Sequence, residues 1–561
     1  MDGATYKTDV LIIGSGGAGL RAAIEAAKSR VSVLLVSKGP IGLANTTAVA
    51  GGGITAALGD TDPRDSPESH ARDTISGSRY LCNPNLVKIF TEEAPDRVRE
   101  LERYGVPFER QNGKFIQYQM PGHTYARDCQ IAYPNRTGSW IPPGSGGIMM
   151  NKAMRQVAQS AGVKFLENIL IFELIRETNV KGALGIDLKD GRLQAFEARA
   201  TILATGGAGQ IYLRNAVPKG ITGDGFSIGL RTGTELIDVE FVQFYAPTII
   251  QTGVPQWRLP YHYLLEMGAV FLDEQGQNAL HKYGYTSTNK VTRDIIARLC
   301  GIHGSLRLDM RGVTQEQWRN KVLRSTKTEL LKYHIDLQKD LLSVSYTGYH
   351  FMGGIRINEK CETGLQGLYA AGEVTGGIHG ANRLGSNEFP EMLVFGARAG
   401  HYAAEYAKAT TSEPPTPNLV EKQRKIQEYL SRAAQEDTHP EKIRQNIQTV
   451  VWKHLGPVRT KIGLETAISE LKDIREKKMP VTFAKTTHEL QLAIENQFLL
   501  DVSELVAKSA LLRTESRGAH YRLDYPEEDS KWMKNIVASA NDEGTIRLLT
   551  EDSLAISESE T

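Results

Sequence analysis

The stretch that most constrains the fold is an apolar run, Asp9 to Ile13, followed directly by the glycine-rich stretch GSGGAG. Gly14, Gly16 and Gly19 have the spacing G-x-G-x-x-G, and an alanine-rich segment follows them. The first glycine makes a tight turn, the second lets backbone approach a pyrophosphate, and the third allows close packing of helix on strand. A second apolar run, VSVLLVSK, comes next. The order strand, glycines, helix, strand predicts a Rossmann-like dinucleotide-binding unit.

Two later segments also read as apolar strands that end at glycines. In ATILATGGAG the strand ends in Gly206 and Gly207, and in GLYAAGEV the strand, Leu368 to Ala371, ends in Gly372 and Glu373. Three such junctions, far apart in the chain, predict one discontinuous nucleotide-binding domain with other material inserted. A flavin nucleotide, which is long and needs contacts at both ends, suits this arrangement better than a transiently bound nicotinamide. Ser37 and Lys38 also end the second strand where nicotinamide sites usually carry an acidic residue for the ribose.

Composition narrows the class of protein further. With 561 residues the chain exceeds what one core usually organises, so we expect about two or three domains. The 66 basic and 65 acidic residues nearly balance, which argues against nucleic acid or an anionic membrane as a partner. The four cysteines stand singly, which predicts a reducing, cytoplasmic setting and no metal site. No apolar segment is long enough to span a bilayer, so attachment to the inner face of a membrane would come through partner subunits.

Further motifs resemble the family of succinate dehydrogenase and fumarate reductase flavoprotein subunits, which includes L-aspartate oxidase. They are GGGITAALGD, PGHTYARD with RTG, ITGDGFSIGLRTG, TRDIIAR, HGANRLGSN and RTESRGAHYRLDYPEEDSKW. The resemblance implies an α/β fold: a discontinuous FAD-binding domain over residues 1–234 and 350–415, an inserted α+β capping domain that carries the substrate site over 235–349, and a helical C-terminal domain over 416–561. The stretch KATTSEPPTPN supports that last boundary as a linker.

The resemblance implies that the cofactor is FAD. The residues assigned to it are Gly14, Gly16, Gly17, Gly19, Ser37, Lys38, Thr46, Thr47, Gly52, Gly53, Thr205, Gly206, Asp224, Glu373 and Ser386. Glu373 is expected on the flavin's ribose and Ser386 beside the isoalloxazine ring. In respiratory members a histidine just before the segment A-A-Q-G-G-I attaches the flavin covalently. Here the aligned position is Thr46, so we expect the FAD to be held noncovalently.

Redox interconversion of a carbon–carbon single and double bond needs a hydride carrier, a proton donor on the opposite face, and cations that hold the substrate carboxylates. The resemblance implies that Arg293 in TRDIIAR shuttles the proton, that Glu266 assists it, and that Arg383 in HGANRLG grips a carboxylate. Two structural alternatives stay open. In the first, Arg293 forms an ion pair with Asp294 on the surface of a helix. In the second, Arg383 forms a salt bridge between domains.

Two family histidines that contact substrate carboxylates are replaced together. The family's Q-F-H-P-T appears as QFYAPT, with Tyr245 at the histidine position. The family's H-Y-x-x-G-G appears as GYHFMGG, so Tyr349 takes the histidine position and His350 falls one residue later. In an extended segment a one-residue shift turns a side chain to the opposite face, so we expect His350 to point away from the flavin unless the backbone bulges. These linked changes indicate a carboxylate substrate modified from succinate or fumarate. It would carry one carboxylate only, or a bulkier or less charged second arm that the two tyrosines line.

Electrons must also leave the flavin, and the chain has no cluster ligands or haem motif of its own. We therefore expect an iron–sulfur partner subunit. Three alternatives remain open. One is a self-sufficient flavoenzyme like L-aspartate oxidase, which Thr46 favours. The others are a relative of adenylylsulfate reductase and a non-catalytic electron-transfer subunit.

Overall fold

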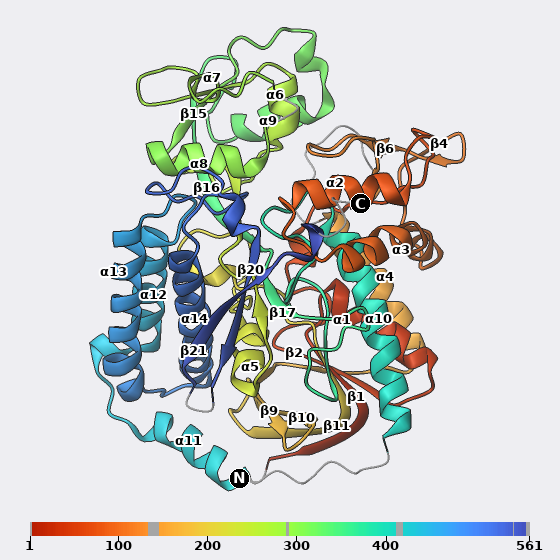
Figure 1. The fold of residues 1–561 in the computed structure, drawn as a ribbon, viewed down its shortest axis with the longest axis vertical. Helices are drawn as coiled ribbons and strands as arrows, with labels where there is room; N and C mark the ends of the chain where they lie inside the picture. Colours follow the sequence, from red (N-terminus) through yellow and green to blue (C-terminus); the bar gives the residue numbers. More distant parts are fainter. Residues whose placement is uncertain (1–2, 133–144, 288–290, 411–418, 542–543, 557–561) are drawn as a thin grey trace.

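The computed structural model describes residues 3–132, 145–287, 291–410, 419–541 and 544–556. The motif RTG at 136–138 and most of the linker KATTSEPPTPN lie outside the described residues. Figure 1 shows the largest sheet at one end of an elongated molecule, a smaller sheet with short helices at the other end, and a stack of C-terminal helices along one side. The mixed α/β fold expected from the sequence is confirmed.

The largest sheet has the strand order β8-β2-β1-β11-β10-β9, and β18 also pairs with the end of β11. Its strands are β1 (Thr5–Ile13), β2 (Val33–Ser37), β8 (Lys164–Glu167), β9 (Ile169–Arg176), β10 (Val180–Asp187), β11 (Leu193–Leu203) and β18 (Leu368–Ala370). β2, β1, β11 and β18 run parallel, and Ile13 stands opposite both Val36 and Leu203. The glycine junctions after these strands therefore meet at one edge of the sheet, where open α/β sheets bind their ligands.

Helix α1 (Gly17–Lys28) packs against the long helix α10 (Glu388–Ala409). The two backbones approach closely at two glycines of α10. A Cβ on Gly396 would lie 2.7 Å from the carbonyl oxygen of Ala18, and one on Gly400 would lie 2.2 Å from that of Ala22. Other helices of this part of the chain are α2 (Pro67–Gly77), α3 (Pro84–Arg103), α4 (Ser145–Ser160) and α5 (Asp224–Thr232).

A four-stranded antiparallel sheet carries the candidate substrate residues. Its order is β13-β16-β15-β14, with β13 (Val242–Ile249), β14 (Val270–Leu272), β15 (Leu306–Asp309) and β16 (Leu342–Phe351). The helices of this part are α6 (Tyr261–Glu266), α7 (Ala279–Lys282), α8 (Arg293–His303) and α9 (Lys321–Leu331). The pairing of β13 with β16 shifts by one residue, because Gln243 stands opposite His350 whereas Phe244 stands opposite Gly348. Tyr349 is therefore the extra residue of a β-bulge.

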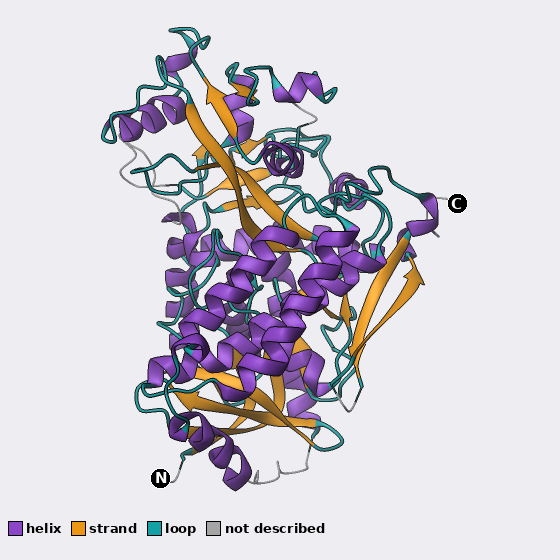
Figure 2. Cartoon of the chain, turned by 90° about the vertical axis from the view of Figure 1, so that its left-hand side faces the viewer, coloured by secondary structure: helices purple, strands orange, loops and turns teal. Residues whose placement is uncertain are grey.

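The C-terminal part is helical through α11 (Leu419–Ser431), α12 (Pro440–His454), α13 (Lys461–Asp473) and α14 (Thr487–Leu512), and it then ends in two strands (Figure 2). β20 (Lys534–Ala540) and β21 (Ile546–Asp552) extend a sheet in the order β19-β17-β12-β20-β21. The other strands of that sheet are β12 (Leu236–Ile237), β17 (Gly354–Arg356) and β19 (Thr375–Gly376). The end of the chain is thus tied to elements from the middle of the sequence. Among the described residues, no helix is both long and apolar enough to cross a membrane.

Candidate active site

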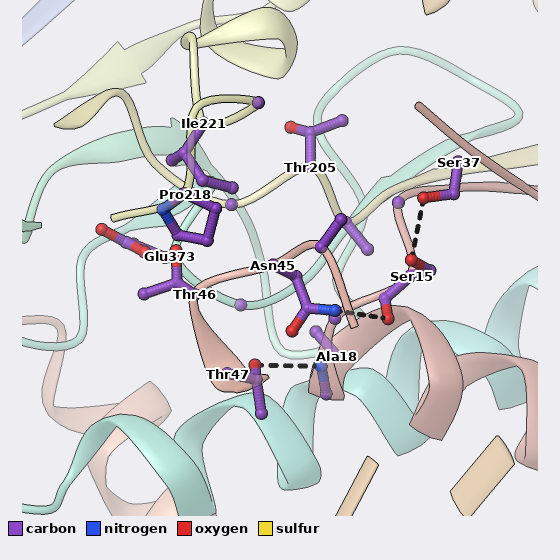
Figure 3. Close-up of a pocket in the computed structure, with 18 of the residues that line it drawn as sticks. Ser15, Ala18, Ser37, Asn45, Thr46, Thr47, Thr205, Pro218, Ile221 and Glu373 are labelled. Carbon is purple, nitrogen blue, oxygen red and sulfur yellow. Dashed lines mark hydrogen bonds between the residues drawn. The ribbon is translucent and has the colours of Figure 1, made fainter. Parts of the chain in front are cut away.

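A cavity of about 350 Å³ lies at the carboxyl edge of the large sheet. Most of the residues that the sequence assigned to the cofactor line it: Gly14, Gly16, Gly17, Ser37, Lys38, Thr46, Thr47, Thr205, Gly206, Asp224 and Glu373. Tyr349, His350 and Arg258 also line the cavity. Segments far apart in the sequence therefore meet there (Figure 3).

The glycine-rich loop has the geometry that its sequence predicted. Gly14 has a φ of +112°, and a Cβ there would lie 2.2 Å from the carbonyl oxygen of Ala204. Gly19 does not line the cavity. A Cβ on it would lie 2.0 Å from the carbonyl oxygen of Gly14, so this glycine lets α1 pack onto the turn. The N-terminus of α1 opens onto the cavity, which is the arrangement that binds a pyrophosphate.

A short loop covers the glycine-rich turn and is held to it by hydrogen bonds (Figure 3). The backbone N–H of Gly17 donates to Oγ1 of Thr47 at 3.1 Å, and Nδ2 of Asn45 donates to the carbonyl of Ser15 at 3.3 Å. Between them, Oγ1 of Thr46 is buried against the cavity with no hydrogen-bond partner among the described residues. A buried hydroxyl left in this way is costly. A flavin in the cavity would supply the partner, so the residues present fit FAD.

Gly52, Gly53 and Ser386 do not line this cavity. They lie together beside it, since a Cβ on Gly53 would be 2.7 Å from Oγ of Ser386 and 2.6 Å from Oδ1 of Asp128. The carbonyl of Ser386 accepts a hydrogen bond from Oγ1 of Thr55 at 3.2 Å. Burial raises the pKa of Asp128 to about 7. The assignment of these three residues to the cofactor stays a prediction.

Lys38 closes one end of the cavity through a buried ion-pair group. Its Nζ lies 2.9 Å from Oδ2 of Asp224 on α5 and 3.1 Å from Oε1 of Glu495 on α14, and it donates to Oγ1 of Thr222 at 2.8 Å. Arg444 binds the second carboxylate oxygen of Glu495 at 2.6 Å. Sequence reasoning missed Glu495, because nothing local links it to a strand end 457 residues earlier.

Glu373 lies deep in the cavity. One carboxylate oxygen accepts the backbone N–H of Phe351 at 3.1 Å and lies 3.5 Å from Nδ1 of His350. Burial raises the pKa of Glu373 to about 7 and lowers the pKa of His350 well below its ordinary value, so the imidazole is neutral. The expected contact of Glu373 with the flavin's ribose stays a prediction.

Arg293 and Arg383 converge on the side-chain carbonyl of Gln243. Oε1 of Gln243 accepts a hydrogen bond from Nη1 of Arg293 at 3.4 Å and another from Nη2 of Arg383 at 2.8 Å. Nη1 of Arg383 also donates to the carboxylate of Glu388. Gln243 stands in the quoted motif QFYAPT but was not singled out from the sequence.

The two structural alternatives for these arginines are wrong. Arg293 is only 7% exposed, and Asp294 accepts a hydrogen bond from Asn382 at 3.2 Å. Arg293 is therefore not a surface partner of Asp294. Arg383 is 2% exposed, and it forms its ion pair with Glu388. Because Glu388 lies only five residues further along the chain, this ion pair does not join two domains.

Tyr245 and Tyr349 form an edge-to-face pair beside these arginines. Their ring centroids are 5.2 Å apart, and the guanidinium carbon of Arg293 lies 5.7 Å from the Tyr245 centroid and 5.6 Å from the Tyr349 centroid. The hydroxyl of Tyr245 donates to the carbonyl of Leu259 at 2.9 Å. Burial raises the pKa of Tyr245, so this ring is neutral. The two tyrosines thus present aromatic faces to buried cations.

His350 meets the exception that the sequence left open, because the backbone bulges at Tyr349. His350 and Tyr349 both line the cavity, although they are neighbours in one strand. The β-bulge at Tyr349 is the physical reason, because the extra residue breaks the alternation of faces on which the expectation depended.

The structure does not place Glu266 beside Arg293. Glu266 is exposed at the end of α6, and it has no hydrogen bond or ion pair within the described residues. The first residue of that helix, Tyr261, is buried beside Arg293 instead. The assignment of Glu266 as a helper of the proton shuttle stays a prediction. The sequence carried a signal for neither the helix bounds nor Tyr261.

Comparison with known proteins agrees with this geometry. The family model described as FAD binding domain matches residues 9–389, and the one described as fumarate reductase flavoprotein C-term matches residues 444–557. The chain is 35% identical over 554 residues to one of the subunits of fumarate reductase (CoM/CoB) from Methanothermobacter marburgensis, covering 96% of this chain and 98% of the relative. It is 29% identical over 554 residues to L-aspartate oxidase of a Nostoc species, covering 94% of this chain and 92% of the relative. The solved structure of Mycobacterium smegmatis Sdh1 in complex with UQ1 has a TM-score of 0.87 at 30% identity, and the match covers 98% of this chain and 95% of that one.

Proposed function

Because this chain belongs to the family of fumarate reductase and succinate dehydrogenase flavoprotein subunits, which are FAD-dependent oxidoreductases, we propose that it interconverts a carbon–carbon single and double bond next to a carboxylate. The observation that carries the proposal is the convergence of Arg293 and Arg383 on Gln243 beside the flavin cavity. One buried cation would hold the substrate carboxylate, and the other would face the carbon that gains or loses a proton.

FAD, when bound, supplies the hydride chemistry at its N5 atom. The chain's own part is to bind, orient and protonate. Arg383 is fixed by Gln243 and Glu388 and so presents its guanidinium in one orientation. Arg293 is buried among the neutral side chains of Tyr245, Tyr261 and Tyr349, and a guanidinium has an ordinary pKa far above neutrality. It therefore keeps its proton until a strongly basic carbon develops beside it, which suits a donor to a reacting carbon.

The substrate that we propose differs from succinate and fumarate. Tyr245 and Tyr349 stand in place of two cationic or hydrogen-bonding histidines of the family pattern and leave a more aromatic wall. A substrate with a longer or bulkier second arm would lie against that wall. Anaerobic assay of the flavin-loaded protein with fumarate, succinate and aspartate tests this point. Turnover of any of them at ordinary enzymic rates would overturn the modified substrate, but it would leave the class of reaction intact.

We further propose an iron–sulfur partner subunit that carries electrons to or from the flavin. The relative from Methanothermobacter is named as one lettered subunit of its enzyme, which supports a multisubunit assembly. Attachment to the inner face of a membrane would come through such a partner. Anaerobic co-purification of the chain from its source, followed by iron and flavin analysis, tests the proposal: a chain that purifies alone and turns over with oxygen would contradict it.

One observation favours a second candidate, a self-sufficient oxidase like L-aspartate oxidase. Thr46, which lines the cavity, cannot form the family's histidyl bond to the flavin. Oxygen consumption by the isolated flavin-loaded chain with L-aspartate would support this candidate.

A further inference from the structure

We propose that Arg258 is a specificity-determining residue that binds an anionic group at the far end of the substrate's second arm. Arg258 lies on the segment between β13 and α6, outside every motif on which the family resemblance rests. The inference rests on the proposed function, because it takes Arg293 and Arg383 as the groups that serve the reacting end.

Arg258 reaches the same tyrosine ring as the two other arginines. Its guanidinium carbon lies 5.3 Å from the centroid of Tyr349, and those of Arg293 and Arg383 lie 5.6 Å and 5.5 Å from it. Arg258 also lies 5.8 Å from the centroid of Tyr245. Three guanidinium groups therefore surround one aromatic side chain, and Arg258 lines the flavin cavity itself.

The charges around Tyr349 do not balance within the chain. Arg383 has Glu388 as its counter-ion. By contrast, no carboxylate oxygen of a described residue lies within the ion-pair limit of 4.0 Å from Arg258 or Arg293. Arg293 is buried and Arg258 is partly exposed. A buried cation is costly unless an anion pairs with it, and a partly exposed one remains available to bind an anion. A substrate with one carboxylate at the reacting end and a second anion near Arg258 would supply both counter-charges.

Arg258 is held in place without using up its donors. Its Nη2 donates to the backbone carbonyl of Val49 at 3.1 Å, which joins the capping segment to the loop over the flavin cavity. The neighbouring backbone is fixed as well, because the N–H of Leu259 donates to the carbonyl of Pro247 at 3.0 Å. A guanidinium has five N–H donors in a planar fork, so several remain for a carboxylate.

This arrangement explains how the site can lose two histidines and still take a dianion. Tyr245 and Tyr349 are neutral side chains at the two family histidine positions, whereas Arg258 brings a permanent positive charge from a different element. The second arm would run along the tyrosine pair and end at Arg258.

The experiment uses the flavin-loaded chain, in its complex if a partner co-purifies. The probes are fumarate, glutaconate and 2-hexenedioate, each paired with the monomethyl ester at the carboxylate remote from the reacting bond. Binding is titrated anaerobically through the change in the flavin absorption spectrum, so the readout does not depend on turnover. At least one diacid is expected to bind wild type about tenfold more tightly than its ester, the usual worth of a charge-assisted bond.

Arg258→Gln is expected to weaken the binding of that diacid by about tenfold and to leave the binding of its ester almost unchanged. The ratio of the two dissociation constants should therefore fall towards one. Arg258→Lys is expected to restore part of the preference, because it keeps the charge. Arg311→Gln is the matched control, since Arg311 is an exposed arginine of the same part of the chain, paired with Asp309. Flavin content and melting temperature are measured for each variant.

Three results would overturn the proposal: a diacid preference that persists in Arg258→Gln, a wild type that binds no diacid better than its ester, or an Arg258→Gln variant that loses flavin rather than ligand. Failure of the proposed function would look different. In that case Arg293→Gln would leave the oxidation of reduced flavin by the preferred substrate unchanged, whatever Arg258→Gln does.

Discussion

Replacement of Arg293 by glutamine is expected to slow the substrate-dependent step without releasing the flavin. Arg293 does not line the flavin cavity, whereas it stands between Tyr245, Tyr261 and Tyr349 beside Arg383. If it donates the proton to the reacting carbon, its loss should lower the rate of flavin oxidation by substrate about 10²- to 10⁴-fold. Glutamine keeps a polar side chain, but its neutral amide cannot act as a general acid.

The structure predicts that this loss far exceeds the cost in stability. A rate loss of that size corresponds to about 3 to 5.5 kcal/mol of transition-state stabilisation. The hydrogen bond from Arg293 to Gln243 is a long one at 3.4 Å, and no carboxylate among the described residues lies within 4.0 Å of Arg293 as its counter-ion. Its removal should therefore cost only about 1 kcal/mol of unfolding free energy. Arg383→Gln should cost more, because it leaves Glu388 without its cation.

The assay mixes the reduced, flavin-loaded variant with substrate under anaerobic conditions and follows the return of the oxidised flavin spectrum. Flavin content and urea unfolding are measured on the same preparations. Arg293→Lys is the matched control, since it keeps a titratable cation at the site. The reasoning is refuted if Arg293→Gln oxidises its flavin as fast as wild type, or if its rate falls only in proportion to lost flavin or lost folded protein.

Three further predictions concern the cofactor and the buried charges. Acid denaturation should release all the flavin from the purified protein, because Thr46 cannot form the family's histidyl bond; flavin that stays with the precipitate would contradict this. Lys38→Met should lower the free energy of urea unfolding by about 3 to 5 kcal/mol, because it leaves Asp224 and Glu495 facing each other without their shared cation. Adding Asp224→Asn to that variant should recover part of the lost unfolding free energy. Burial raises the pKa of Glu373 from 4.5 to about 7, so in the flavin-free protein its contribution to stability is full below about pH 4.5 and is lost as the pH rises to about 7. Glu373→Gln should remove that loss, so the unfolding free energy of the variant relative to wild type should rise across this window; a pH-independent difference would count against the assignment.

Much of the flavin site follows from local sequence. Gly14 and Gly19 sit at a strand–helix turn where a Cβ would collide with backbone, and such turns are encoded by the residues that form them. Thr46 and Glu373 could be placed through motifs next to strand ends, and both line the cavity. Parallel strands bring such ends together at one edge of a sheet, so the arrangement of the cofactor residues could be anticipated.

The substrate side could not be derived in the same way, because its geometry depends on tertiary detail. A single extra residue in β16 brings Tyr349 and His350 to one cavity, and the residue alternation of a regular strand hides this. Tyr261 could not be found from the sequence, because it is the buried first residue of the short helix α6, whose last residue, Glu266, is exposed. Arg258 has no motif of its own, and only the folded chain shows that it shares a ring with Arg293 and Arg383.

The buried ion pair between Lys38 and Glu495 has a consequence for biosynthesis. It joins a strand end made early in translation to α14, which leaves the ribosome late, and Gln491 of the same helix forms part of the cavity wall. A nascent chain that has completed its glycine-rich loop still lacks this wall. We therefore expect FAD to be captured only after α14 has been synthesised, and a chain that ends before Thr487 to emerge without its cofactor.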